Sequence, residues 1–119
     1  MVEKGKNDLA DRLFRFAVAV IKATRKLPNA AEYRVIIHQL VKSATSTGAN
    51  YEESQAAVSN ADFSNKIGIA LKEMRETHYW IRIVVATLPE HQPWLPLEKE
   101  ADELKRILGS IYSKTSRKR

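Results

Sequence analysis

The stretch from Ser59 to Leu88, SNADFSNKIGIALKEMRETHYWIRIVVATL, decides the fold of this chain. Its apolar residues recur at intervals of three and four, the period of one face of an α-helix. Ser59 and Asp62 resemble a capping box, with Asp in place of Glu, and Pro89 ends the pattern. The stretch therefore predicts a helix over residues 60–88. Its apolar face comprises Phe63, Ile67, Ala70, Leu71, Met74, Ile81, Val84, Val85 and Leu88.

The same period continues on both sides of this stretch. It predicts further helices over residues 8–27, 30–58 and 97–113. Prolines separate the segments, because Pro28 stands alone and three more prolines fall within residues 89–96. Four amphipathic helices with short links pack most simply side by side. The sequence therefore predicts an all-α protein, an antiparallel up-down four-helix bundle.

Length and composition fit a single small domain. The chain has 119 residues, enough to bury a core without disulfides or metal, and it contains no cysteine, which fits a reducing cytosol. The longest apolar run, residues 16–21, is far too short for a membrane span, and the N-terminus has no signal-peptide pattern. We expect a cytoplasmic protein with an N-terminal arm (1–7), the bundle domain (8–113) and a basic tail (114–119).

Two of the predicted helices carry more apolar surface than one bundle core needs. Helix 8–27 has a second apolar strip beside its core face, and helix 60–88 has a second row at heptad spacing. Soluble monomers rarely expose large contiguous apolar patches. We therefore expect both strips to be buried between subunits of a homo-oligomer. The predicted oligomer interface consists of Phe14, Val18, Ile21, Ile69, Trp80 and Ile83.

The positive charge of the chain is concentrated at its two ends. The formal net charge is +6, with seven Lys or Arg against three acidic residues in 1–26 and four basic residues in 114–119. Such a distribution favours an anionic partner, most often nucleic acid, although a solubilising surface with a disordered tail is the alternative. The candidate nucleic-acid-binding residues are Lys4, Lys6, Arg12, Arg15, Lys22, Lys26, Lys114, Arg117, Lys118 and Arg119.

No pattern of residues predicts catalysis or metal binding. A di-iron bundle needs two Glu-x-x-His pairs, and neither Glu73 nor Glu76 begins one. Together with Glu53, these carboxylates form an acid/base set or a polar network, and we favour the network because no nucleophile or phosphate loop accompanies them. Trp94 either docks a partner or plugs one end of the bundle, and the plug is favoured. We expect no catalytic residues, metal, cofactor or small-molecule substrate.

Two blocks carry a resemblance to a known family. They are residues 39–53, QLVKSATSTGANYEE, and residues 62–80, DFSNKIGIALKEMRETHYW. Over residues 8–112 the chain resembles the four-helix bundle proteins encoded in intervening sequences of some bacterial 23S ribosomal RNA genes. The resemblance implies a ring-shaped homopentamer of bundles around a central pore. The residues that match signature positions, which we interpret as a structural polar network joining the second and third helices, are Ser43, Ser46, Asn50, Glu53, Glu73 and Glu76.

The resemblance also extends to the accessory variability proteins of diversity-generating retroelements. Those proteins are basic pentamers that bind nucleic acid and a reverse transcriptase. Residues 107–112, ILGSIY, followed by the basic tail, are similar to their C-terminal end. We therefore expect a non-enzymatic oligomeric scaffold that binds nucleic acid electrostatically, RNA more than DNA. The alternative is a protein-interaction adaptor that partners a reverse transcriptase.

Overall fold

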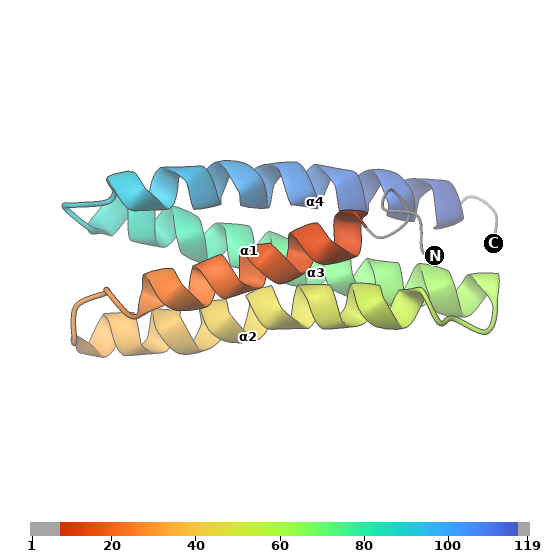
Figure 1. Ribbon diagram of the computed structural model, residues 1–119, viewed down its shortest axis with the longest axis horizontal. Coiled ribbons are helices and arrows are strands. Elements are labelled where there is room, and N and C mark those ends of the chain that lie inside the picture. Colours follow the sequence, from red (N-terminus) through yellow and green to blue (C-terminus); the bar gives the residue numbers. More distant parts are fainter. Residues whose placement is uncertain (1–7, 117–119) are drawn as a thin grey trace.

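Four helices, each antiparallel to the one before it, make up the described part of the chain (Figure 1). The computed structural model describes residues 8–116, and no strand occurs among them. The predicted all-α, up-down four-helix bundle is therefore confirmed. The helices are α1 (Asp8–Thr24), α2 (Ala31–Ser54), α3 (Asn60–Thr87) and α4 (Leu95–Ser116), and a 3-10 turn, η2 (Gln92–Trp94), leads into α4. The predicted contacts Lys4, Lys6, Arg117, Lys118 and Arg119 lie outside the described residues.

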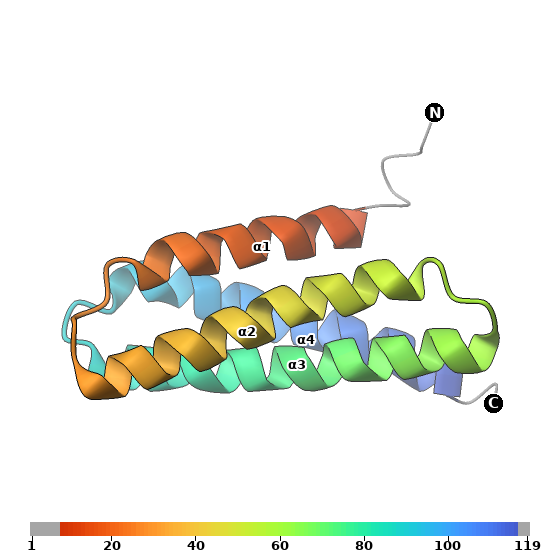
Figure 2. The same ribbon diagram turned by 90° about the horizontal axis from the view of Figure 1, so that it is seen from below.

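Helix α1 is the shortest element and covers only part of the bundle. It has 17 residues, whereas α2, α3 and α4 have 24, 28 and 22. It packs mainly on α2 and meets α4 over a shorter stretch (Figure 2). The start of α1 and the end of α4 point toward the same end of the bundle, as an even number of antiparallel helices requires.

The first predicted helix extends too far, because α1 ends at Thr24 rather than at residue 27. The amides of Lys26 and Leu27 donate to the carbonyls of Ala23 and Thr24, three residues back, which tightens the chain into a turn. Leu27 also precedes Pro28, and a residue before proline is pushed out of the helical region.

The second predicted helix is also too long, because α2 ends at Ser54 rather than at residue 58. The cause is the start of α3. Ser59 is extended and its hydroxyl accepts a hydrogen bond from the Asp62 amide (3.0 Å), while the Asp62 carboxylate accepts one from the Val58 amide (3.2 Å). The bond from the Asp62 amide to Ser59 is the one that the predicted capping box requires, whereas the carboxylate of Asp62 accepts from Val58 instead of from the Ser59 amide. This second bond holds Val58 in the turn before α3.

Helix α4 begins two residues before, and ends three residues beyond, the predicted 97–113. Pro96 lies in the first turn of α4, where backbone N–H groups have no partner within the helix. The missing N–H of proline therefore costs nothing there, and the helix can begin before it. At the other end the Thr115 hydroxyl donates to the Tyr112 carbonyl (3.0 Å). Lys114, assigned above to a tail, is therefore part of a helix.

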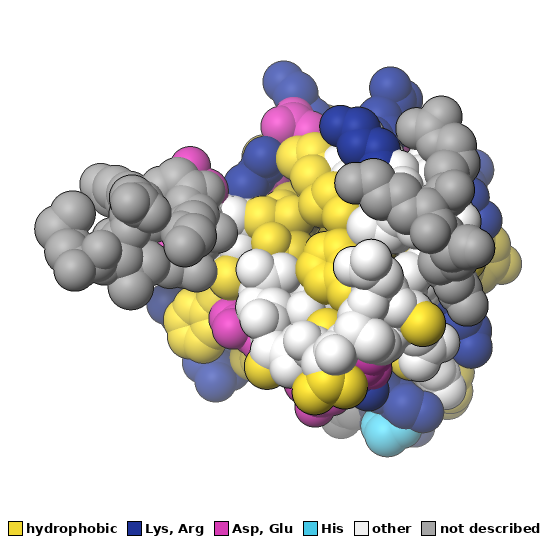
Figure 3. Space-filling model, turned by 90° about the vertical axis from the view of Figure 1, so that its right-hand side faces the viewer, with side chains coloured by type: hydrophobic (Ala, Val, Ile, Leu, Met, Phe, Trp, Pro, Cys, Tyr) yellow, Lys and Arg dark blue, Asp and Glu magenta, His cyan; other side chains and the backbone are white. Residues whose placement is uncertain are grey.

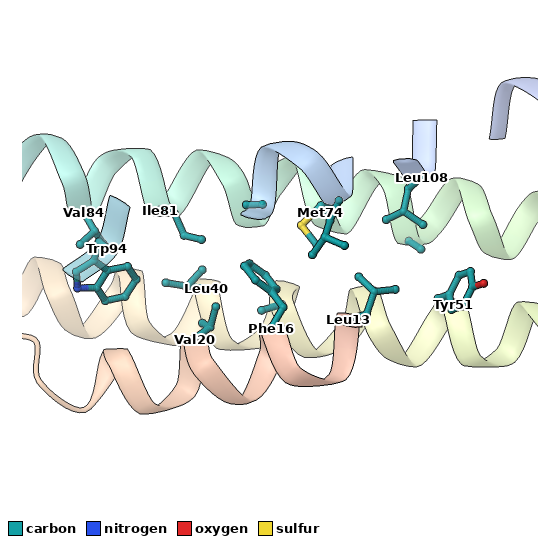
Figure 4. Packing of buried hydrophobic residues seen from close by; sticks show 14 of the residues in the cluster. Leu13, Phe16, Val20, Leu40, Tyr51, Met74, Ile81, Val84, Trp94 and Leu108 are labelled. Carbon is teal, nitrogen blue, oxygen red and sulfur yellow. The ribbon is translucent and has the colours of Figure 1, made fainter. Parts of the chain in front are cut away.

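The core is a column of apolar side chains between the four helices (Figure 4). Leu13, Phe16 and Val20 of α1 enter it from the face that the sequence predicts. Trp94 is 3% exposed and closes the core at the end where α3 turns into α4, which confirms its interpretation as a plug. The fully buried aliphatic side chains are Leu13, Val20, Leu40, Ile67, Met74, Ile81, Val84, Leu104 and Leu108.

A pair of buried hydroxyls joins α2 to α3 inside this apolar column. The Thr77 hydroxyl lies 2.8 Å from the Ser43 hydroxyl and 2.8 Å from the carbonyl of Glu73. Ser43 Oγ also lies 3.2 Å from the carbonyl of Leu40, and the Thr47 hydroxyl donates to the Ser43 carbonyl at 2.9 Å. Among the described residues, every buried side-chain nitrogen or oxygen has a partner. The small side chains let the two helices approach closely without leaving a polar atom unsatisfied.

We predict that Thr77→Val lowers the free energy of unfolding by about 1 kcal/mol, because it keeps the shape of the side chain and removes the bond to Ser43. The matched control is Thr45→Val, an exposed threonine on α2 that bonds only to its own helix. Urea denaturation monitored by circular dichroism measures both variants. Equal effects at the two positions would show that the link between α2 and α3 contributes no net stability.

Candidate functional site

The predicted contact residues of α1 are partly neutralised by ion pairs. Arg12 spans from α1 to α4, where Nε and Nη2 donate to the two oxygens of Glu100 at 2.8 Å each, and Nη2 also donates to Glu103 at 2.6 Å. Arg15 pairs with Asp11 one turn away. Arg12 thus acts as a clamp that fixes α1 on α4, and its charge is shared with two carboxylates.

This clamp shifts the pKa values of its members. The hydrogen bond from Arg12 lowers the pKa of Glu100 below its ordinary value, against the opposing effect of burial. The hydrogen bonds that Arg12 donates to Glu100 and Glu103 raise its own pKa above the ordinary value. Both shifts favour the charged pair over its neutral form.

The remaining predicted contact residues that the structure describes, Lys22, Lys26 and Lys114, are exposed. Lys22 and Lys26 are exposed, and they border a hollow of about 390 Å³ that also includes Glu90 and Trp94. Lys114 is exposed near the end of α4. Figure 3 looks onto the end of the bundle where α1 begins and α4 ends, and it shows hydrophobic side chains near the centre with Lys and Arg side chains around them.

The structure reveals a cationic groove between α3 and α4 that the sequence analysis did not predict. It has a volume of about 490 Å³, and no Asp or Glu of the described residues lines it. Arg75 and Arg82 make no ion pair with any residue in 8–116. A count of charge along the chain does not reveal this groove, because α4 carries carboxylates as well as cations and the cationic lining comes from two helices. The lining residues are Leu71, Arg75, His78, Tyr79, Arg82, Lys105, Arg106 and Gly109.

Charges within the groove interact across the two helices. Nζ of Lys105 lies 3.1 Å from Nδ1 of His78, and both Lys105 (3.5 Å) and Arg106 (3.0 Å) contact the carboxylate of Asp102 at the margin. Burial lowers the pKa of His78, and the nearby Lys105 ammonium lowers it further. A neutral His78 can accept a hydrogen bond from Lys105, so the groove holds the histidine uncharged beside its cations.

A second groove, between α1 and α2, is apolar. It has a volume of about 320 Å³, and all three α1 residues of the predicted interface, Phe14, Val18 and Ile21, line it. Phe14 is 65% exposed, the largest value for any aromatic residue described. Gly48 forms part of the α2 wall, where an added Cβ would lie 3.7 Å from Leu13, an ordinary contact distance. The second apolar strip of α1 is therefore at the surface, as the sequence predicts.

The second apolar row, on α3, is more buried than the apolar strip on α1. Trp80 and Ile83 are half-buried and pack against the core, while Ile69 borders a shallow hollow with Gly68 and Tyr112. Trp80 also donates a hydrogen bond from Nε1 to the Glu76 carboxylate at 3.3 Å. These α3 residues thus have contacts within the subunit that those of α1 lack.

The predicted polar network divides into separate contacts within residues 8–116. Ser43 joins α2 to α3 through Thr77, and Glu53 does so through an ion pair with Lys66 at 3.5 Å. Asn50 bonds instead to Ser46 within α2, and Glu76 bonds to Trp80 within α3. Glu73 takes part through its backbone carbonyl, which accepts a hydrogen bond from the Thr77 hydroxyl. The partner that completes the link, Thr77, is absent from the predicted set because its hydroxyl falls on the apolar face.

Two structural features are absent from residues 8–116. They contain no group of three His, Asp or Glu side chains placed to hold a metal ion. None of their helices combines the length and the apolar character that a membrane crossing requires.

The fold and the two grooves define a small four-helix bundle protein with one apolar and one cationic surface. The sequence model of the 23S rRNA-intervening sequence protein family matches residues 6–110, and the chain belongs to this family.

A solved relative supports the same assignment. It is a crystal structure of a protein with unknown function from the S23 ribosomal protein family of Bacteroides thetaiotaomicron, 34% identical in sequence, with a TM-score of 0.79. The match covers 87% of this chain and 97% of that one. No curated protein matches the chain.

We predict that the Arg12 clamp makes stability depend on pH in the acid range. Because the folded state lowers the pKa of Glu100 below its ordinary 4.5, the clamp stabilises the protein fully above that pH and less as pH falls through the lowered pKa. Glu100→Gln should flatten the decline of unfolding free energy below about pH 4.5, as urea denaturation between about pH 3 and pH 6 can measure. Glu32→Gln, an exposed position on α2, is the control, and parallel curves for wild type and Glu100→Gln would contradict the prediction.

Proposed function

We propose that this protein is a non-enzymatic, oligomeric scaffold that binds nucleic acid through its Lys and Arg side chains, RNA in preference to DNA. The observation that carries the proposal is the separation of the two surfaces. Apolar side chains unused by the core gather between α1 and α2, and unpaired cations gather between α3 and α4. One surface is suited to assembly and the other to a polyanion.

Assembly is supported by the composition of the α1–α2 groove. Glu52 is the one charged side chain among the described residues that line it, and most of the others are apolar. Glycine at position 48 costs about 1 kcal/mol relative to alanine in a helix interior. Since an alanine Cβ would fit against Leu13, Gly48 is not needed for the packing of α1, but it leaves the groove deeper for a partner.

Polyanion binding is supported by where the unpaired charge lies. Glu100 and Glu103 neutralise the charge of Arg12, and Asp11 neutralises that of Arg15. Of the predicted contact residues in this described region, Lys22 of α1 and Lys26 of the turn that follows keep an unpaired charge. The α3–α4 groove adds Arg75 and Arg82, which raise the local field without opposing carboxylates in its lining. Repetition of these cations around a ring would multiply the field for a long phosphate chain.

A protein-interaction adaptor for a reverse transcriptase is the alternative, and it would use the same apolar groove. Nucleic-acid binding separates the two proposals, because an oligomer that binds neither RNA nor DNA would leave the adaptor as the better supported function.

We predict that the wild-type chain sediments as a discrete oligomer, with five subunits favoured, and that Phe14→Glu dissociates it into folded monomers. A buried carboxylate without a partner is unfavourable at an interface, whereas Phe14 is mostly exposed in the subunit. The matched control is Val35→Glu, because Val35 is 58% exposed on α2 outside the groove. Sedimentation and circular dichroism report assembly and folding. A wild-type monomer at micromolar concentration would refute the assembly.

We predict that affinity for single-stranded RNA falls steeply with salt, with a log–log slope of about −0.7 for each phosphate contact. Replacing Lys114, Arg117, Lys118 and Arg119 by Gln should weaken binding to all sequences alike and make the slope shallower, if these residues contact phosphate. Replacing Lys22 and Lys26 by Gln tests α1 in the same way. Fluorescence anisotropy with labelled RNA measures both. An oligomer that binds neither RNA nor DNA at about 50 mM salt would overturn the nucleic-acid proposal.

A further inference from the structure

The cationic groove contains an aromatic side chain that the packing of the bundle does not require. Tyr79 is 52% exposed and lines the groove together with the unpaired Arg75 and Arg82. These three residues occupy positions i, i+4 and i+7 of α3, so they form one stripe in which the tyrosine lies a turn from each arginine. The two arginines are separated by about 10 Å along the helix axis.

The far wall of the groove is also cationic. Lys105 and Arg106 of α4 face the stripe across a floor made by Leu71 and Gly109. A Cβ at position 109 would have its nearest neighbour, Leu71, at 4.0 Å, so the floor is open there. Asp102 engages Lys105 and Arg106 from the margin, which leaves Arg75 and Arg82 as the cations without a carboxylate contact in the described part of the chain.

The ring of Tyr79 is held by its neighbours. It meets Trp80 edge-on, with ring centroids 5.4 Å apart and planes at 74°. Trp80 is in turn fixed by its hydrogen bond to Glu76 and by its contact with the core. A ring oriented in this way loses little conformational freedom when a ligand stacks on it.

We propose that the α3–α4 groove binds single-stranded nucleic acid, with a base stacked on Tyr79 and the flanking phosphates on Arg75 and Arg82. This inference rests on the proposed function and deepens it by naming the form of the ligand and its site. An exposed aromatic face between cations provides the two contacts that single-strand binding uses, stacking for bases and positive charge for the backbone. In a duplex the bases are paired and stacked on each other, so only the charge would act.

The first experiment separates stacking from charge. Binding of a twelve-nucleotide oligouridine and of an RNA duplex of the same length is measured by anisotropy across a salt series. Tyr79→Ala should weaken oligouridine binding about five-fold or more, with no change in salt slope, and leave duplex binding unchanged. Tyr79→Phe, which keeps the ring, should bind like wild type. Equal loss for the single strand and the duplex, or no loss for either, would overturn the stacking assignment.

The second experiment locates the phosphate contacts. Arg75→Gln combined with Arg82→Gln should reduce the salt slope by about 1.4, at 0.7 for each contact. Arg34→Gln combined with Lys42→Gln removes the same charge from exposed positions on α2, outside the groove, and should leave the slope closer to that of wild type. Equal changes in the two double variants would show that charge acts without a groove.

The outcomes distinguish this inference from the function on which it rests. Wild-type protein that binds RNA but is insensitive to both Tyr79→Ala and the Arg75 and Arg82 double variant would overturn the groove and leave the nucleic-acid scaffold standing. Wild-type protein that binds no nucleic acid would overturn both. Sedimentation of Tyr79→Ala completes the test, because dissociation of the oligomer by this variant would place Tyr79 in a subunit interface and refute the stacking role.

Discussion

The close packing of α2 on α3 is the constraint on which the rest of this structure depends. Ser43, Ala44 and Thr47 present small side chains on α2, and Thr77 meets them from α3 with a buried hydroxyl. Around this seam the larger apolar side chains of all four helices fill the core, among them Leu40 of α2 and Met74 of α3. The two outer helices take their positions from the α2–α3 pair, and each of the two grooves lies where an outer helix meets it.

The sequence predicted the number, direction and inward faces of the helices because the apolar period and the prolines are local signals. The predicted helix ends were wrong where contacts with residues of the next helix or turn determine the end. Val58 fits the period of α2, yet the capping of α3 by Ser59 and Asp62 draws it out of the helix. In the sequence Pro96 suggests the end of a helix. In the structure it occupies the first turn of α4, where proline is tolerated, directly after the buried Trp94.

A candidate site could be predicted from the sequence when it lies on one helix, but not when it is formed by two. The apolar strip of α1 could be read from one helix, since its residues recur along one face. The cationic groove could not, because it is formed by two helices whose charges partly cancel in any count along the chain. Which arginines are available depends on partners distant in sequence, such as Glu100 for Arg12. Tyr79 was hidden in the same way, because its exposure is decided by the angle at which α4 crosses α3.

The short length of α1 gives the fold an uneven local stability. This helix has the least contact with the other three, and it is held by four core side chains, the Arg12 clamp and a turn at Leu27. Opening of α1 alone therefore costs less than unfolding the other three helices, whose long mutual seams melt as a unit. Whatever occupies the groove between α1 and α2 binds the closed form only. Through mass action, the concentration of any such partner would then set how often α1 detaches from the other three helices.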